Sequence, residues 1–187
     1  MIRVAALALL ALLSVAPARA QTLEQMAGQM IIVGFKGDDV QDASFKAIRA
    51  EIAAGTLGGV MYLKPNVKSL AAVKAMNAAL RAASPELPPF LTLDQEGGAV
   101  ERLTSAVGFG EMPNAETVAA DDSPAQAEAA YAAMAKGIAE EGFTVNFGPI
   151  ADLNINPDNQ VIAKFGRSFG RSDKTRSEER RVGKQCR

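Results

Sequence analysis

Apolar runs of strand length alternate along the chain with segments in which apolar residues recur every three or four positions. An apolar run without polar alternation is typical of a strand that is buried on both faces, as in parallel sheets. A spacing of three and four is typical of an amphipathic helix. The runs therefore predict four strands, at residues 31–35, 59–63, 89–94 and 144–148.

Helices are predicted before the first strand and between successive strands. A capping-box sequence at residues 22–25 begins the first helix, and a serine-proline pair at residues 123–124 begins the last. Asn66 is expected to cap the helix between the second and third strands, while Gly55 and Gly142 are expected to end the helices before the second and fourth. The apolar stripes consist of Leu23, Met26 and Met30; Phe45, Ile48 and Ile52; Leu70, Val73, Met76 and Leu80; and Tyr131, Met134 and Ile138.

Four alternations of strand and helix predict a parallel α/β fold. A doubly wound open sheet and part of a barrel both fit this order. No G-x-G-x-x-G motif follows the first strand, which argues against a dinucleotide-binding sheet. A complete (β/α)8 barrel needs about 250 residues, so a chain of 187 residues holds only part of one. Long loops follow the third strand, at residues 95–122, and the fourth, from residue 149 onward.

The N-terminal residues have the features of a secretory signal peptide. Arg3 precedes an apolar run at residues 4–13, and a small-residue cleavage pattern ends at Ala20. The run is too short to cross a hydrocarbon core of about 30 Å as a helix. Residues 1–20 are therefore predicted to be removed, which leaves a periplasmic or secreted protein without a membrane segment. An uncleaved membrane anchor is the alternative.

The amino-acid composition limits the kinds of catalytic and binding chemistry that the chain can provide. Hydrophobic residues make up 48% of the chain and charged residues 22%, as in folded globular proteins. The only cysteine is Cys186, so no disulfide framework is expected. The chain has no histidine, and therefore lacks the commonest general acid or base and the commonest metal ligand. No metal or organic cofactor is indicated.

Charge is divided unevenly along the chain. Residues 1–163 carry 11 basic and 18 acidic side chains, whereas residues 164–187 carry 9 basic and 3 acidic ones. The basic end has few aromatic residues, which argues against a nucleic-acid partner. Residues 176–187 have no apolar periodicity and resemble the translation of a sequencing adapter, so we expect a non-native tail. A genuine basic tail is the alternative.

Charged side chains gather after the third predicted strand, where Asp94, Glu96, Glu101 and Arg102 surround two adjacent glycines. Carboxylates accept hydrogen bonds from hydroxyls and guanidinium groups donate them, so these residues could bind a polyol. A structural alternative is equally open, in which Asp94 caps a helix and Glu96 or Glu101 pairs with Arg102. Asp94 and Glu96 do not fit a pair of catalytic carboxylates, because retaining glycosidases place these on opposite sides of the scissile bond.

The loop after the fourth predicted strand is rich in asparagine and aspartate at residues 152–159. Such segments form turns through hydrogen bonds from side chain to backbone, and this interpretation applies to Asn154, Asn156 and Asp158. Arg167 follows between two glycines. An arginine held by flanking turns can serve as a fixed hydrogen-bond donor in a cleft, so Arg167 is a candidate binding residue.

The run Asp94-Gln95-Glu96-Gly97-Gly98, with Val100 and Arg102 after it, resembles the D-Q-E-G-G-x-V-x-R signature of glycoside hydrolase family 3 β-N-acetylhexosaminidases. Residues 147–152, 156–162 and 166–169 are similar to a second block of that family. The resemblance implies a TIM (β/α)8 barrel, of which residues 21–175 form about the first four β/α units. It also implies that Asp94, Arg102 and Arg167 bind the hydroxyls of an N-acetylglucosamine unit.

The same resemblance implies hydrolysis of terminal β-linked N-acetylglucosamine in peptidoglycan fragments or chitooligosaccharides, by an aspartate nucleophile and a histidine acid/base. Neither catalytic residue has a counterpart here, so the chain alone is expected to be inactive, and its two unclosed sheet edges favour aggregation. A further departure is Ala99, where the family often has arginine. A family 3 β-glucosidase and a non-catalytic sugar-binding protein are the alternatives.

Overall fold

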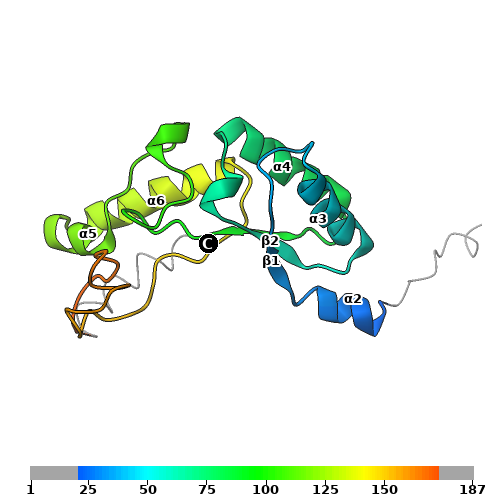
Figure 1. Ribbon diagram of the computed structural model, residues 1–187. Coiled ribbons are helices and arrows are strands. Elements are labelled where there is room, and N and C mark those ends of the chain that lie inside the picture. Colours follow the sequence, from blue (N-terminus) through cyan, green and yellow to red (C-terminus); the bar gives the residue numbers. More distant parts are fainter. Residues whose placement is uncertain (1–20, 173–187) are drawn as a thin grey trace, which may run out of the picture.

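A computed structural model describes residues 21–172, which form a four-stranded parallel sheet with helices packed against it (Figure 1). The strands are β1 (Ile32–Gly34), β2 (Gly59–Tyr62), β3 (Phe90–Leu93) and β4 (Val145–Asn146), in the order β1-β2-β3-β4. Each strand lies within the apolar run that predicted it, and the predicted parallel α/β fold is confirmed. The predicted signal peptide at residues 1–20 and the predicted tail at residues 176–187 lie outside the described residues.

The described residues form five α-helices, and four of them lie close to the predicted positions. They are α2 (Leu23–Gly28), α3 (Ala43–Ala54), α4 (Leu70–Ala83), α5 (Ala115–Asp121) and α6 (Pro124–Glu140), and the short 3-10 helices are η1 (Lys64–Asn66) and η2 (Ser105–Val107). Capping boxes at Thr22 and Ser123 start α2 and α6. Gly55 ends α3 in a left-handed conformation, with φ of 73°. Helix α5 lies inside the segment that was expected to be a loop, and its N-cap is Asn114.

The prediction that Asn66 caps α4 is wrong, because Ser69 is the N-cap and accepts a hydrogen bond from the Ala72 backbone N–H. Asn66 instead ends η1, and its side-chain amide donates to the carbonyl oxygens of Phe35 (3.0 Å) and Gly37 (2.8 Å). The amide therefore ties the end of β1 to the end of β2. This long-range role has no local sequence signal.

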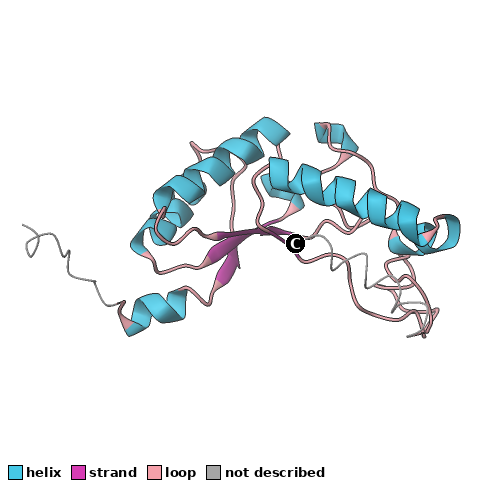
Figure 2. Cartoon of the chain, turned by 180° about the vertical axis from the view of Figure 1, so that it is seen from behind, coloured by secondary structure: helices cyan, strands magenta, loops and turns pink. Residues whose placement is uncertain are grey.

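One face of the sheet carries the core. The pairing register aligns Val33, Val60 and Leu91 across three strands, and aligned residues of a parallel sheet share a face. Helices α3, α4 and α6 lie over this face (Figures 1 and 2). Their predicted stripes supply eight buried side chains of the core: Phe45, Ile52, Val73, Met76, Leu80, Tyr131, Met134 and Ile138.

The opposite face has no such helical cover within residues 21–172 (Figure 2). Ile32, Phe90 and Phe147 are 37%, 51% and 50% exposed. The predicted stripe of α2 is exposed as well, with Leu23 79% and Met30 87% accessible. In a complete (β/α)8 barrel this sheet face points inward and is filled by side chains of the other strands. Among the described helices, none is both long and apolar enough to span a membrane.

Candidate functional site

Three consecutive polar residues follow β3, and each side chain has a different partner. Asp94, Gln95 and Glu96 lie at the carboxyl end of the strand, which is the end where parallel α/β folds build ligand sites. In an extended segment successive side chains point to opposite sides. Gln95 therefore points toward the core, as Leu93 does, while Asp94 and Glu96 point to the other side.

Asp94 pairs with Arg102. The Nη2 of Arg102 donates to Oδ2 of Asp94 at 2.8 Å, and about a fifth of each side chain is exposed. The alternative in which Glu96 or Glu101 pairs with Arg102 is therefore wrong. The Nε of Arg102 is buried and has no hydrogen-bond partner among the described residues. A buried donor without a partner is costly. Because Nε is shielded, the nitrogen of Arg102 that is open to a ligand is Nη1, which makes no hydrogen bond among the described residues.

Gln95 holds the segment that carries Arg102. Its amide oxygen accepts from the backbone N–H groups of Arg102 (2.9 Å) and Leu103 (3.0 Å), and its amide nitrogen donates to the Leu103 carbonyl (2.8 Å). The side chain is completely buried. Sequence reasoning missed this role, although Gln95 has the same alternation as the buried residues Leu91 and Leu93.

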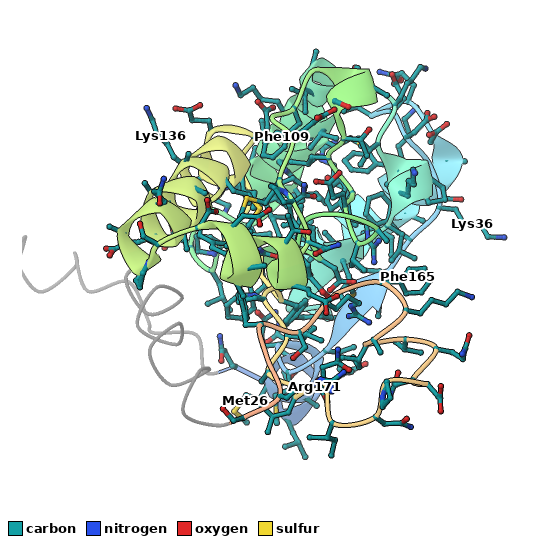
Figure 3. The ribbon with its side chains drawn as sticks, turned by 90° about the vertical axis from the view of Figure 1, so that its left-hand side faces the viewer. Met26, Lys36, Phe109, Lys136, Phe165 and Arg171 are labelled. Carbon is teal, nitrogen blue, oxygen red and sulfur yellow. The ribbon has the colours of Figure 1, made fainter. Side chains whose placement is uncertain are left out.

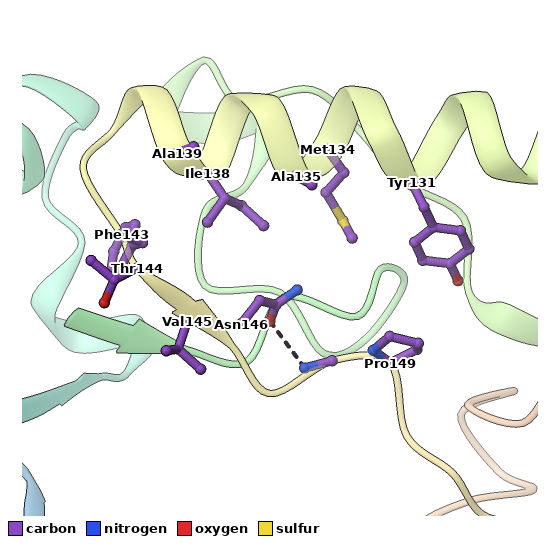
Figure 4. Close-up of a pocket in the computed structure, with 11 residues that line it drawn as sticks. Tyr131, Met134, Ala135, Ile138, Ala139, Phe143, Thr144, Val145, Asn146 and Pro149 are labelled. Carbon is purple, nitrogen blue, oxygen red and sulfur yellow. Dashed lines mark hydrogen bonds between the residues drawn. The ribbon is translucent and has the colours of Figure 1, made fainter. Parts of the chain in front are cut away.

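Asn146 on β4 fixes the backbone of Gln95. Its Oδ1 accepts from the Gln95 N–H at 2.9 Å and its Nδ2 donates to the Gln95 carbonyl at 2.8 Å. The same Oδ1 also accepts from the Gly148 N–H at 3.0 Å, as Figure 4 shows. The ends of β3 and β4 are therefore locked together. Asn146 was also missed, and the available signal was a polar residue inside an apolar strand.

Arg167 pairs with Glu96 from a distant part of the chain. Its Nε donates to Oε2 of Glu96 at 2.9 Å and its Nη2 donates to Oε1 at 2.7 Å. The side chains are only 18% and 9% exposed. Hydrogen bonding to Glu96 raises the pKa of Arg167 above its usual value, burial opposes this, and the charges of Glu96, Asp152 and Asp94 raise the pKa further.

The loop around Arg167 is held on both sides. The Gly166 carbonyl accepts from the Glu116 N–H of α5 at 2.9 Å, and the Ser168 hydroxyl donates to the Asp152 carbonyl at 2.7 Å. The Asx-turn interpretation of Asn156 is confirmed, because its Oδ1 accepts from the Asp158 N–H. The fixed backbone brings Arg167 to the end of β3.

The three predicted binding residues thus gather at one end of the sheet. Asp94 and Arg102 are in direct contact, and Asp94 is close enough to Arg167 to affect its pKa. A separate cavity of about 220 Å³ lies between α6 and β4 (Figure 4), lined mainly by apolar side chains such as Met134, Ile138 and Phe143. None of the three predicted residues lines this cavity, which shares Asn146 and Gly148 with the polar network.

The turn at Gly97 depends on the absence of a side chain. Gly97 has φ of 100°, and a Cβ there would lie 2.3 Å from the Pro113 carbonyl oxygen. We expect Gly97→Ala to reduce the free energy of unfolding by about 2–4 kcal/mol, from backbone strain plus the clash. Urea unfolding of the purified protein measures this loss. Gly110→Ala is the matched control, because a Cβ at Gly110 meets nothing within 4 Å.

Glu101 has a carboxylate oxygen that is buried and lacks a partner among the described residues. Burial raises the pKa of Glu101, and the charge of Glu111 adds to this, whereas the Met112 backbone N–H and Lys64 lower it. Because the pKa is raised on folding, the contribution of Glu101 to stability is full below the ordinary carboxyl pKa and is lost as the pH rises through the raised value.

Glu101→Gln should therefore change the Tm of the protein more favourably at pH 7, where Glu101 of the wild type is charged, than at pH 4, where it is protonated. Glutamine keeps an oxygen that can accept from the Met112 N–H but carries no charge. The measurement is the difference in Tm between variant and wild type at the two pH values. Glu140→Gln, at an exposed surface pair with Lys136, should show no such change with pH. An equal Tm difference at both pH values for Glu101→Gln would contradict the prediction.

The site region includes no candidate metal centre. Across residues 21–172, no group of three or more cysteine, aspartate or glutamate side chains is placed to hold a metal ion. The donors and acceptors at the end of β3 are instead arranged as two ion pairs. Such an arrangement suits a neutral ligand with many hydroxyls, since both charges of each pair are balanced.

Parallel strands with a charged cluster at their carboxyl ends define the class of parallel α/β proteins with a ligand site at that end of the sheet. Residues 22–178 match the family described as "Glycosyl hydrolase family 3 N terminal domain". The chain therefore belongs to glycosyl hydrolase family 3.

Relatives within the family agree with this assignment. The chain is 30% identical to beta-hexosaminidase A of Pseudoalteromonas piscicida, over 75% of this chain and 27% of that protein. It is 28% identical to a beta-hexosaminidase of Xanthomonas campestris pv. campestris (strain B100), over 75% of this chain and 45% of the relative. The chain thus spans less than half the length of either relative.

A solved structure confirms the fold class. The glycoside hydrolase family 3 beta-N-acetylglucosaminidase of Paenibacillus sp. str. FPU-7 superposes with a TM-score of 0.79 at 29% identity, over 89% of this chain and 31% of that chain. The prediction that the four β/α units form part of a TIM (β/α)8 barrel is confirmed by this likeness.

Proposed function

We propose that the protein to which this chain belongs is a β-N-acetylhexosaminidase that removes terminal β-linked N-acetylglucosamine from peptidoglycan fragments or chitooligosaccharides. In this proposal the chain supplies the sugar-binding residues Asp94, Arg102 and Arg167. The observation that carries the proposal is their convergence at the carboxyl end of β3 as parts of two ion pairs, at 2.8 and 2.7 Å. The names of the relatives support the same substrate class.

The unused polar atoms of the two ion pairs support sugar binding. Within the described part of the chain, Oδ1 of Asp94 and the Nη1 atoms of Arg102 and Arg167 make no hydrogen bond. One acceptor and two donors are thereby left for a ligand. Sugar hydroxyls both donate and accept hydrogen bonds, so a single sugar ring can satisfy all three.

Catalysis in the proposed reaction needs groups that this chain lacks. It contains no histidine, and Asp94 and Glu96 follow one another too closely to act from opposite sides of a glycosidic bond. We therefore propose that the acid/base and the nucleophile come from residues outside the chain. The role of the chain is to hold the terminal sugar against those groups.

The proposed function is tested with the complete gene product and nitrophenyl glycosides. We expect hydrolysis of the N-acetyl-β-glucosaminide, much slower hydrolysis of the β-glucoside, and no turnover by the 187-residue chain alone. Preference for the glucoside would favour a β-glucosidase. Calorimetric binding of N-acetylglucosamine without turnover would favour a non-catalytic sugar-binding protein. Either result would overturn the proposal.

We also propose that the protein is exported and that the leader is cleaved after Ala20. The charge and apolar pattern of residues 1–20 supports this. Cell fractionation followed by N-terminal sequencing of the mature protein tests it. A cytoplasmic protein that still begins with Met1 would contradict the proposal.

A further inference from the structure

Glu96 is the most deeply buried charged residue near the candidate site, with 8% of the residue exposed. Both of its carboxylate oxygens accept from Arg167, at 2.7 and 2.9 Å. We propose that Glu96 is a positioning residue, which holds the Arg167 guanidinium in the orientation that a sugar at the Asp94 and Arg102 pair requires. This inference rests on the proposed function and adds a residue to it.

The geometry of the pair explains how an arginine on a loop becomes a fixed donor. Two parallel hydrogen bonds define the plane of a guanidinium group, whereas a single one leaves it free to rotate. Glu96 occupies the edge formed by Nε and Nη2, so the edge that contains Nη1 points away from it. The carboxylate therefore sets both the direction and the availability of the remaining donors.

Glu96 also keeps the two ion pairs separate. The negative charges of Asp94 and Asp152 act on Arg167 as well. Without Glu96, the guanidinium would be attracted toward Asp152 and Asp94, and Asp94 already accepts from Arg102 at 2.8 Å. A second arginine on Asp94 would use the oxygen that we propose for a sugar hydroxyl. Glu96 thus protects an acceptor as well as orienting a donor.

The connection spans two distant sequence segments. Glu96 follows β3 and Arg167 lies 71 residues later. The backbone of Glu96 is fixed independently, because its N–H donates to the Val100 carbonyl at 2.9 Å. Rigid support of a binding group by its neighbours is what precise ligand contacts need. Through its carboxylate, Glu96 therefore links the loop that carries Arg167 to the rigid backbone at the end of β3.

The test compares Glu96→Gln and Glu96→Asp in the complete gene product. Glutamine removes the charge and one acceptor, whereas aspartate keeps the charge but is shorter. We expect Glu96→Gln to raise KM for the nitrophenyl N-acetyl-β-glucosaminide by about ten-fold or more while kcat changes by less than about three-fold. Glu96→Asp should show a smaller rise. Glu140→Gln, at an exposed pair, should leave both constants unchanged.

A double-mutant cycle shows whether Glu96 acts through Arg167. In an Arg167→Met background, Glu96→Gln should change KM by less than about two-fold, because the group it positions is gone. An additive rise in KM would overturn the inference. So would a fall in kcat and Tm at unchanged KM in the single variant, since a purely structural role reduces the amount of active protein.

A second readout separates this inference from the proposed function. If the wild type hydrolyses no N-acetylglucosaminide, the proposed function fails. The positioning claim is then judged by NMR, from the hydrogen exchange of the Arg167 Nε–H. We expect slow exchange in the wild type and at least ten-fold faster exchange in Glu96→Gln, because the proton loses its charged acceptor. Equal exchange rates would overturn the claim.

Discussion

Replacing Asp94 with alanine should lower kcat/KM for an N-acetyl-β-glucosaminide by about a hundred- to a thousand-fold. Two losses combine in this variant. The proposed sugar hydroxyl loses a charged acceptor, which contributes about 1.5–3 kcal/mol. Arg102 loses the carboxylate that fixes it at 2.8 Å, so the contact that we propose between Arg102 and the sugar should weaken. Steady-state kinetics of the complete gene product measures the effect.

Further variants test whether the loss of activity comes from the Asp94 and Arg102 pair acting as a unit. Arg102→Met should cost about as much as Asp94→Ala, and the double variant should cost little more, because the two residues act as a unit. Asp121→Ala, at an exposed residue at the end of α5, should keep kcat/KM within about two-fold of the wild type. If Asp94→Ala has the same kcat/KM as the wild type, Asp94 does not bind the sugar.

The strands and most helix boundaries were predictable because their signals are local. An apolar run such as residues 59–63 predicts a doubly buried strand wherever it occurs, and β2 lies at Gly59–Tyr62. Side-chain capping at Ser123 depends on residues three positions apart. These features involve neighbours in sequence, so their energies can be estimated before the fold is known.

The partners of the charged residues were not predictable in the same way. Arg102 has three carboxylates near it in sequence. The sequence alone left a polyol-binding cluster and a pairing of Arg102 with Glu96 or Glu101 equally open. The alternation after β3 does not decide the choice, because it puts Asp94 and Glu96 on the same side. In the fold Glu96 is occupied by Arg167, and Arg102 pairs with Asp94. Arg167 then becomes available to Glu96 only when the loop after β4 folds back against α5.

Helix α5 is a second feature that the sequence analysis did not predict. Residues 95–122 contain four glycines and one proline, which are typical of loops, yet Ala115–Asp121 is helical. Its Asn114 cap is a local signal that was overlooked. Its fixed position has a tertiary cause, because the Glu116 N–H donates to the Gly166 carbonyl at 2.9 Å. The short helix therefore belongs structurally to the loop that carries Arg167.

Outside the site, a loop of the same segment packs on α6 in a way that the apolar pattern did not reveal. A Cβ at Gly137 would lie 3.0 Å from the ring of Phe109, so the ring rests directly on the helix backbone, and Figure 3 shows Phe109 beside that helix. The glycine gives no helix-forming advantage. Its presence inside α6 is explained by this close approach.

Gln95→Leu should cause the largest loss of stability among single substitutions in this region. Leucine has a similar size but cannot form the three hydrogen bonds of the Gln95 amide. Two backbone N–H groups and one carbonyl would then lack their partner, and each unsatisfied buried group costs about 1–3 kcal/mol. The expected total of about 3–6 kcal/mol is comparable to the whole stability of many domains.

Gln95→Leu should also lose activity at urea concentrations below those that unfold the protein, because the segment that the Gln95 amide no longer holds carries Arg102. Urea unfolding followed by far-UV circular dichroism measures stability, and kinetics at low urea measures the site. The matched control is Gln160→Leu, at an exposed glutamine that donates only to the Asp158 carbonyl, and it should cost less than about 0.5 kcal/mol. If Gln95→Leu costs no more than Gln160→Leu, the Gln95 amide does not hold the segment, and the rigid placement of Arg102 must have another cause.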